Sequence, residues 1–404
     1  MARFQYAGRD RLGKKSGTVT AQTKREAMLR LKEDGIRVIE MNEIPETLLT
    51  KEIVIGNPVK LQHFVIFLRQ FSTLLNAGVT VVDATRILGQ QTESKYLRKA
   101  LEGIELDLRE GNPLSQAAAK HKKIFSPMFI NMMKAGEAGG NMDETLDRLA
   151  VHYEKQHNTR QKITSAMAYP IVVAFIAVAV VIFLLVSVVP TFVDMFADFG
   201  GELPAITQFV LKASNFMQGS WYMIVLVFVL AALAISAVKN NRKTKYYYDY
   251  ILLRIPIFGS MLQKAVLARM TRTLSSLFSS SVPILTAMTI VEEVVENEVI
   301  GKVIRSSRSS LETGRSITEP MKKHWAFPPL VTQMISIGEE TGSLDSMLGK
   351  VADFYEKEVE NSTDRLKSLI EPMMIVVLAA LVGTIVISIM VPMFEIFNQV
   401  GDHE

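Results

Sequence analysis

Two long apolar runs stand out in the pattern of hydrophobic and polar positions along the chain. The first covers residues 170–190, and no charged residue occurs between Lys162 and Asp194. At about 1.5 Å of rise per residue, roughly 20 apolar residues in a helix cross a bilayer core about 30 Å thick. The second run, residues 372–392, also begins and ends with proline. Both runs are therefore predicted to be membrane-spanning helices.

The two runs belong to a longer repeat. They are 202 residues apart, and the segments before them match in the same order at this offset. Farther upstream the offset becomes 203, which one inserted residue explains. Because chance similarity between helices does not produce an ordered series with one register shift, we infer two tandem copies of one helical unit, each leading into a span. Matching pairs include Phe125 with Phe327, Gly136 with Gly338, Tyr153 with Tyr355, Leu74 with Leu277 and Gly111 with Gly314.

A third apolar run lies between the two copies, at residues 221–238, and begins with Trp221 and Tyr222, which suit a membrane interface. Basic residues stand before the first span, after the second and before the third. The positive-inside rule places these three flanks in the cytoplasm, so the N-terminus is expected there and the C-terminus outside. These basic residues are Lys155, Arg160 and Lys162, then Lys239, Arg242, Lys243 and Lys245, then Arg365 and Lys367.

The predicted fold is mainly α, with two tandem cytoplasmic helical-bundle units, three transmembrane helices and a small N-terminal α+β module. A helix that begins near Met142 is expected to run into the first span, which would carry it well beyond the lipid. The predicted order is an α+β module at 1–43, a linker at 44–60, a helical domain at 61–168, a span at 169–190, an external loop at 191–220, a span at 221–238, a second helical domain at 239–370, a span at 371–392 and an external tail at 393–404.

Composition narrows the class of protein. Hydrophobic residues make up 49% of the chain and charged residues 21%, which fits a membrane protein with large parts in water. The formal net charge is +4, and because the basic residues gather beside the spans, we interpret it as membrane orientation, with no nucleic-acid partner. The chain has no cysteine, which excludes disulfides, thiolate zinc sites and cysteine nucleophiles.

The sequence lacks the common catalytic motifs. It contains neither the Gly-x-x-x-x-Gly-Lys-Ser/Thr phosphate loop nor His-Glu-x-x-His, and its six histidines are scattered. No span has an ionisable residue at its centre, where proton relays and intramembrane peptidases need one. We therefore expect no enzyme activity, cofactor or metal. Acidic residues at predicted helix starts, Asp143, Glu144, Asp147 and Asp345, are explained by the helix dipole, and a divalent-metal site there is the less favoured alternative.

Two sets of small and acidic residues are candidate contact sites. Gly-Glu pairs recur in predicted helix-to-helix connections, where a turn that needs glycine is the simpler interpretation and an edge for docking a partner is the functional one. Small residues four apart in the third span, Ala379 and Gly383, permit close helix packing in lipid. The docking candidates are Gly136, Glu137, Gly338, Glu339 and Gly342.

Several motifs together resemble the PilC/GspF family, the inner-membrane platform proteins of type IV pilus assembly and type II secretion. The first copy departs from the second at Ala135-Gly-Glu-Ala-Gly-Gly140, a change that affects no catalytic residue. The resemblance covers the whole chain. The motifs are Leu68-Arg-Gln-Phe-Ser-Thr-Leu-Leu-Asn-Ala-Gly-Val79, Gly338-Glu-Glu-Thr-Gly-Ser-Leu-Asp345, Ala352-Asp-Phe-Tyr-Glu356 and Glu371-Pro372.

The resemblance implies a scaffold that couples a cytoplasmic assembly ATPase to the polymerisation of pilin or pseudopilin in the inner membrane. Other inner-membrane assembly proteins, the lipid bilayer and further copies of the chain are the remaining expected partners. The loop acids Asp194, Asp198 and Glu202 are candidates to face the emerging pilin. The alternatives are a transporter or channel subunit and a prepilin peptidase. Both alternatives require ionisable residues at the centres of the spans, and the spans of this chain lack them. A pilus, a competence pseudopilus and a secretion system all stay open as the machine.

Overall fold

The computed structural model of the chain describes residues 2–10, 13–21, 24, 28, 31–32, 35–44, 56–197 and 204–401. By its internal contacts the chain divides into an N-terminal unit, Met1–Pro58, and a helical body, Val59–Glu404. The predicted linker at 44–60 falls mostly outside the described residues, because 45–55 are not among them.

The N-terminal unit contains a three-stranded antiparallel sheet. Strand β1 (Ala2–Asp10) lies between β2 (Gly13–Ala21) and β3 (Arg37–Ile44). These strands confirm the β part of the small α+β module predicted at the start of the chain. Among the described residues of this unit, Tyr6, Leu31, Ile36 and Met41 form a buried apolar cluster. A unit of this length buries a small share of its surface, which limits its stability by itself.

The first helical unit packs its helices around a cluster of aromatic side chains. Phe64 of α2 has its ring centroid 5.9 Å from that of Phe125 and 6.2 Å from that of Phe129, and both contacts are edge-on. Helical spacing of apolar residues therefore places one face of α2 in the core. The helices are α2 (Leu61–Asn76), α3 (Val81–Gln91), α4 (Lys95–Arg109), α5 (Leu114–Ala119), α6 (Pro127–Gly139) and the first part of α7 (Met142–Phe183).

The second helical unit repeats this order. The bounds of α12, α13 and α15 equal those of α3, α4 and α6 shifted by 203, 203 and 202 residues, which confirms the predicted repeat and its register shift. Gly78 of the first copy has a positive φ of 83°. Its counterpart Ser281 in the second copy also has a positive φ, of 57°. The helices are α10 (Arg242–Arg254), α11 (Phe258–Ser279), α12 (Ile284–Val294), α13 (Glu298–Glu312), α14 (Thr318–Lys322), α15 (Pro329–Thr341) and the first part of α16 (Leu344–Gly401).

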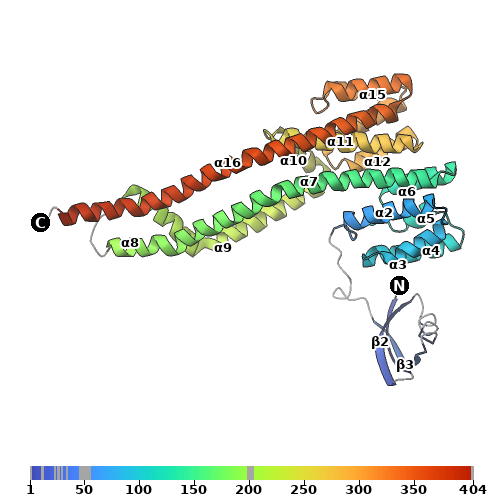
Figure 1. Ribbon diagram of the computed structural model, residues 1–404, viewed down its shortest axis with the longest axis horizontal. Coiled ribbons are helices and arrows are strands. Elements are labelled where there is room, and N and C mark those ends of the chain that lie inside the picture. The colour runs from blue at the N-terminus through green and yellow to red at the C-terminus, as the bar shows by residue number, and fades with distance from the viewer. Residues whose placement is uncertain are drawn as a thin grey trace. The chain divides into compact units, whose positions relative to one another are not determined.

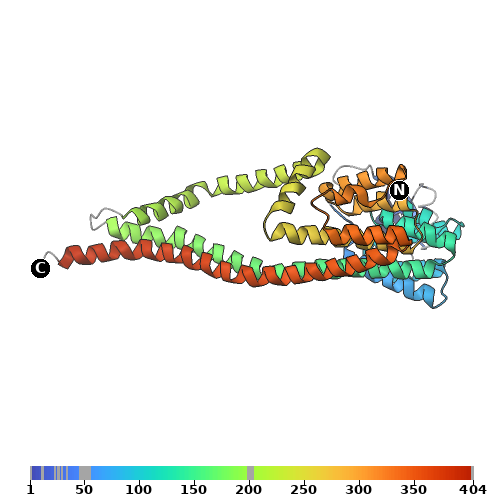
Figure 2. The same ribbon diagram turned by 90° about the horizontal axis from the view of Figure 1, so that it is seen from above.

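Three helices in the described residues are long and apolar enough to cross a membrane. Helix α7 continues through a π-helical turn (Leu184–Val188) into α8 (Val189–Ala197), and α9 (Ala205–Asn240) is the second. The third is α16, whose 58 residues extend about 87 Å. Figures 1 and 2 show α7 and α16 side by side and running in the same direction. The prediction that a unit's last helix continues into its span is confirmed.

The segment expected as an external loop is largely helical. Residues 191–197 belong to α8 and residues 205–220 to α9. Residues 198–203, between these helices, are outside the described residues. Two of its polar side chains donate to backbone carbonyls of neighbouring helices: Thr207 Oγ1 to Ser388 O at 2.6 Å and Ser214 Oγ to Leu185 O at 2.5 Å. Polarity here therefore marks contacts between helices. Likewise the tail predicted from 393 is helical to Gly401.

Candidate functional site

An arginine–glutamate pair fastens the long helix of the first unit to α2. Arg69 donates from Nε and Nη2 to Glu154 Oε1 and Oε2 at 2.7 and 2.6 Å, and from Nη1 to Asp147 at 2.7 Å. The hydrogen bond and charge of Glu154 raise the pKa of Arg69 above its ordinary value. A two-pronged bond of this kind sets the rotation of α7 about its own axis relative to α2.

The second unit has the same pair. Arg272 of α11 donates to Glu356 of α16 at 2.7 and 2.9 Å, and also contacts Asp353. Arg272 corresponds to Arg69 at offset 203, and Glu356 to Glu154 at offset 202. Burial opposes the charge of Arg272, but its bonds to Glu356 and Asp353 outweigh burial, so its pKa is raised.

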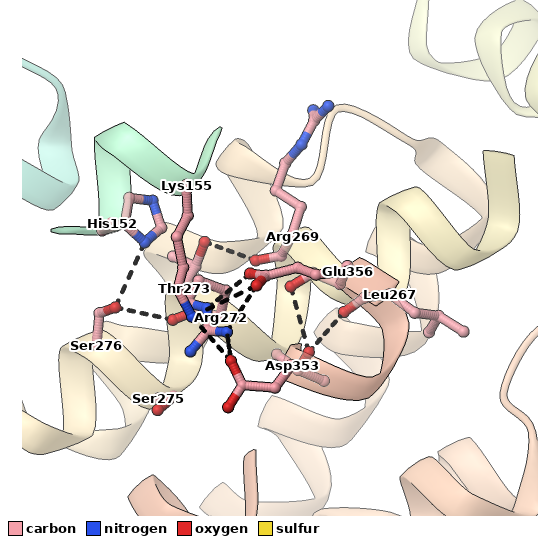
Figure 3. A network of polar contacts seen from close by, with 12 residues as sticks. His152, Lys155, Leu267, Arg269, Arg272, Thr273, Ser275, Ser276, Asp353 and Glu356 are labelled. Atoms are coloured by element: carbon pink, nitrogen blue, oxygen red, sulfur yellow. Dashed lines mark hydrogen bonds and ion pairs between the residues drawn. The ribbon is translucent and has the colours of Figure 1, made fainter. Parts of the chain in front are cut away.

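The two units meet where α7 lies against α11 and α16. Figure 3 shows His152 and Lys155 of α7 pointing toward the side chains of α11 and α16. His152 Nδ1 lies 3.4 Å from Ser276 Oγ. Lys155 Nζ lies 2.8 Å from Asp353 and 3.5 Å from Glu356. The carboxylates that bind Arg272 within the second unit therefore also bind Lys155 of the first unit.

His152 is a buried histidine on the charged part of α7, before the apolar run at 169–190. Its side chain is only 4% exposed. Burial, followed by the nearby positive charges of Arg272 and Arg269, lowers the pKa of His152 to about 3. The imidazole is therefore neutral at physiological pH, and protonating it would add a positive charge beside those of Arg272 and Arg269.

The two predicted docking glutamates have structural partners. Glu137 Oε1 accepts from Ser115 N at 2.8 Å, and Glu339 Oε1 accepts from Ile317 N at 3.1 Å. The second oxygen of each carboxylate accepts a serine hydroxyl, from Ser115 and Ser316 respectively. Each carboxylate therefore satisfies donors at the start of the short helix that precedes its own helix, α5 before α6 and α14 before α15. Partner docking at these residues stays a prediction.

The glycines beside these glutamates do not lie in the predicted connections. Gly136 and Gly338 are buried in the last turns of α6 and α15. A Cβ at Gly136 would lie 2.8 Å from Thr145 Oγ1, and one at Gly338 would lie 3.0 Å from Leu344 Cα, so close packing against the next helix requires glycine. The connection itself begins one turn later, at Gly342 and its counterpart Gly140, whose φ values of 70° and 72° end the helices.

The remaining predicted residues lie apart from this contact. Asp194 is on α8, and Asp198 and Glu202 fall outside the described residues. Ala379 is exposed, and nothing lies within 4 Å of a Cβ built at Gly383. The small-residue face of α16 therefore has no close helix neighbour in the described part of the chain. Its role in helix packing stays a prediction.

No metal-binding cluster is evident in the described residues, where no group of three or more His, Asp or Glu side chains is placed to hold an ion. Asp143 and Glu144 occupy the first turn of α7, and Asp345 that of α16, as the dipole interpretation expects. The site offers ion pairs and a packed contact between helices.

Family models match most of the chain. The model described as type II secretion system protein F matches residues 67–190 and again 270–392, and its N-terminal domain matches 1–42. The chain belongs to the type II secretion system protein F family. The two matched regions coincide with the two repeats, including their spans. Members of this family are structural platform proteins and are not known as enzymes.

Curated relatives are similar over nearly their whole length. Type IV pilus assembly protein PilC of Thermus thermophilus is 38% identical over 98% of this chain and 99% of its own. PilC of Pseudomonas aeruginosa is 35% identical over 92% and 98%. Type II secretion system protein F of Aeromonas hydrophila is 32% identical over 93% and 98%. The predicted PilC/GspF membership and the multi-pass membrane architecture are confirmed.

Sequence reasoning missed the contact between the units. Arg69 and Arg272 recur at the repeat offset, as do the glutamates that they bind, and this signal was available. His152 had no such signal, because its counterpart is Phe354. The recurrence of these charged residues in both copies therefore pointed to the arginine–glutamate pair inside each unit. Nothing in the pattern pointed to the contact between them.

Proposed function

We propose that this chain is a membrane platform that couples a cytoplasmic assembly ATPase to the polymerisation of pilin or pseudopilin. One observation carries the proposal: the last helix of each helical unit is the same helix that forms its span. A continuous helix transmits displacement along its axis, whereas a flexible loop would absorb it. The names of the relatives, which assemble type IV pili or belong to type II secretion, support the same role.

The contact between the units supports joint movement of the two long helices. Lys155 and Lys162 of α7 both pair with acidic residues of α16, and the second pair, with Glu360 at 2.6 Å, lies nearer the apolar run. A force applied to one unit therefore reaches both spans together. Pairs about two turns apart on the same helices resist sliding of one helix along the other.

The orientation in this proposal follows the basic flanks of the spans. The helical units and the N-terminus face the cytoplasm in the inner membrane, and the connection between α8 and α9 faces outward. The ATPase then meets the helical units, while pilin meets the spans and the outer ends of α8 and α9. We place ATPase docking at the ends of α6 and α15, where Gly140, Glu340 and Gly342 are exposed.

A helix-breaking insertion tests the coupling. Four glycines inserted after Ser165 and after Lys367 interrupt α7 and α16 between the helical units and the apolar runs. We expect normal membrane levels and normal ATPase co-purification, but loss of fibre assembly or secretion in cells that carry only this copy. The matched control is the same insertion after Gly111, in the turn between α4 and α5, which should leave assembly intact. Full assembly with both helices interrupted would contradict the proposal.

Ion flux separates this role from the transporter alternative. The apolar runs 170–190 and 372–392 contain no charged residue. Purified chain reconstituted in vesicles should therefore conduct no ions above the level of empty vesicles. Measurable flux that a substitution in these runs alters would favour the channel subunit instead.

A further inference from the structure

Helices α7 and α16 are equivalent in the two units, but they use different faces in the contact between the units. In the first unit, His152 is 4% exposed and the Lys155 side chain 37%, because α7 lies on the second unit. Their counterparts on α16 are Phe354 and Lys357, which are 48% and 67% exposed. Flanking positions inside each unit, such as Leu146 and Leu348, are buried in both copies. The face that docks in the first unit is therefore free in the second.

The receiving face shows the reverse difference. On α11 it contains Arg269, Thr273 and Ser276, and Thr273 is fully buried. The counterparts on α2, at offset 203, are Ile66, Gln70 and Thr73, and all three are exposed. Ile66 is an apolar side chain that is 46% exposed. Within the described helical body, the receiving face that is occupied in the second unit is therefore uncovered in the first.

A contact made by two different faces of similar units is head-to-tail, and such a contact leaves one complementary face open at each end. We propose that a second copy of this chain occupies these faces, with the α16 face of one copy docked on the α2–α7 face of the next. The interface repeats between chains the contact that the two units make within one chain. It follows from the repeat and the exposed faces, and it does not depend on the coupling proposed above.

The chemistry of the two faces is complementary. Lys155 lies 3.5 Å from Glu356 within the chain, and the equivalent pair between copies is Lys357 with Glu154. Phe354 takes the place of His152 and meets Thr73 and Ile66, so an aromatic ring covers an exposed apolar side chain. Asp353 is replaced by Val151, which is also exposed. The contact between copies is therefore more apolar than the one within the chain.

The geometry of the long helices permits this assembly in one membrane. Helices α7 and α16 run in the same direction, as Figure 2 shows, so the operation that relates the two units keeps both spans in the same orientation. Repeating it places a second copy in the same membrane with the same sidedness. Repetition produces a ring if the rotation closes and a row of chains if it does not.

Cysteine cross-linking in membranes tests the interface, because the native chain has no cysteine. Phe354→Cys and Thr73→Cys are introduced in two separately tagged full-length chains that are co-expressed and treated with a short bis-maleimide. The pair corresponds to His152 and Ser276, whose side-chain atoms are 3.4 Å apart. His152→Cys with Ser276→Cys in one chain is the positive control and should cross-link within the chain. We expect a covalent dimer that contains both tags.

The controls decide whether the contact is head-to-tail. Phe354→Cys paired with Glu102→Cys, an exposed position on α4, should give at least tenfold less dimer. Phe354→Cys alone should give none, since the proposed faces differ. Lys357→Glu added to the Phe354→Cys chain should lower the dimer several-fold. Absence of the mixed dimer while the positive control reacts, an equal yield with Glu102→Cys, or a dimer from Phe354→Cys alone would each overturn the proposal.

Discussion

Lys162 Nζ lies 2.6 Å from Glu360 Oε1, so the two long helices are joined shortly before each enters its apolar run. The hydrogen bonds from Lys162 and from Lys357 lower the pKa of Glu360 to about 2, which keeps its carboxylate charged at any physiological pH. Both residues are on the polar part of their helices. Exposed pairs contribute little to stability, so this one chiefly sets the register of α7 against α16.

The first prediction concerns pH. The pKa of His152 is lowered from 6.5 to about 3, so the unfolded state binds a proton that the folded state does not. The stability that the neutral imidazole contributes is therefore complete above pH 6.5 and is lost as the pH falls below it, by about 1 kcal/mol at pH 5.5. Thermal unfolding of the detergent-solubilised chain between pH 8 and pH 5 measures this loss.

His152→Gln is the matched control for that experiment. Glutamine keeps a polar group near Ser276 but does not titrate, so the variant should lose less stability between pH 7 and pH 5.5 than the native chain does. An identical pH dependence in both proteins would assign the effect to other groups. His121 and His324, whose pKa values burial also lowers, would then be the next residues to replace.

We expect the main role of Glu137 to be stabilising the fold, and not binding a partner at the surface. Glu137→Ala leaves Ser115 N–H and Oγ without their acceptor, and we expect a loss of about 1–3 kcal/mol in the free energy of unfolding. Glu137→Gln retains one acceptor oxygen and should lose less. Glu340→Ala, at an exposed neighbour of Glu339, is the control and should change the unfolding temperature little. Equal unfolding temperatures for all three variants would return Glu137 to the docking hypothesis.

Glycine substitutions should separate packing inside the chain from packing against partners. Gly136→Ala places a methyl group 2.8 Å from Thr145 Oγ1, and overpacking of this kind costs about 1–3 kcal/mol, more than alanine regains in helix propensity. Gly383→Ala meets nothing within 4 Å and should leave the unfolding temperature unchanged or slightly higher. Loss of assembly with normal stability in Gly383→Ala would indicate a partner helix at that face, whereas normal assembly would argue against one.

Single cysteines test the membrane orientation. With the helical units in the cytoplasm, Asp194→Cys should react with an impermeant maleimide added to intact cells, and Arg242→Cys should react only after lysis. Ser214→Cys should react in neither case, because Ser214 is fully buried between helices and bonds to Leu185 O. Labelling of position 242 in intact cells would reverse the proposed topology.

Local pattern by itself determined the helices, the spans and the repeat. A run such as 170–190 predicts a span because lipid leaves few alternatives to a helix. Residues that match at a constant offset, such as Phe125 with Phe327, predicted the two units. The family resemblance also followed from motifs that are contiguous in the chain. Each of these features depends on residues that are close in sequence.

Only the tertiary structure decided which polar residues are internal. Ser214 and Thr207 lie in the segment predicted as a loop, yet their hydroxyls donate to carbonyls of helices that are distant in sequence. Glu137 and Glu339 accept hydrogen bonds from residues 22 positions earlier in the chain, which nothing in the local pattern indicated. The burial of His152, against the exposure of its counterpart Phe354, depends on how one unit lies on the other. That difference in burial arises only when the two copies pack together, so the residues of either helix by themselves do not determine it.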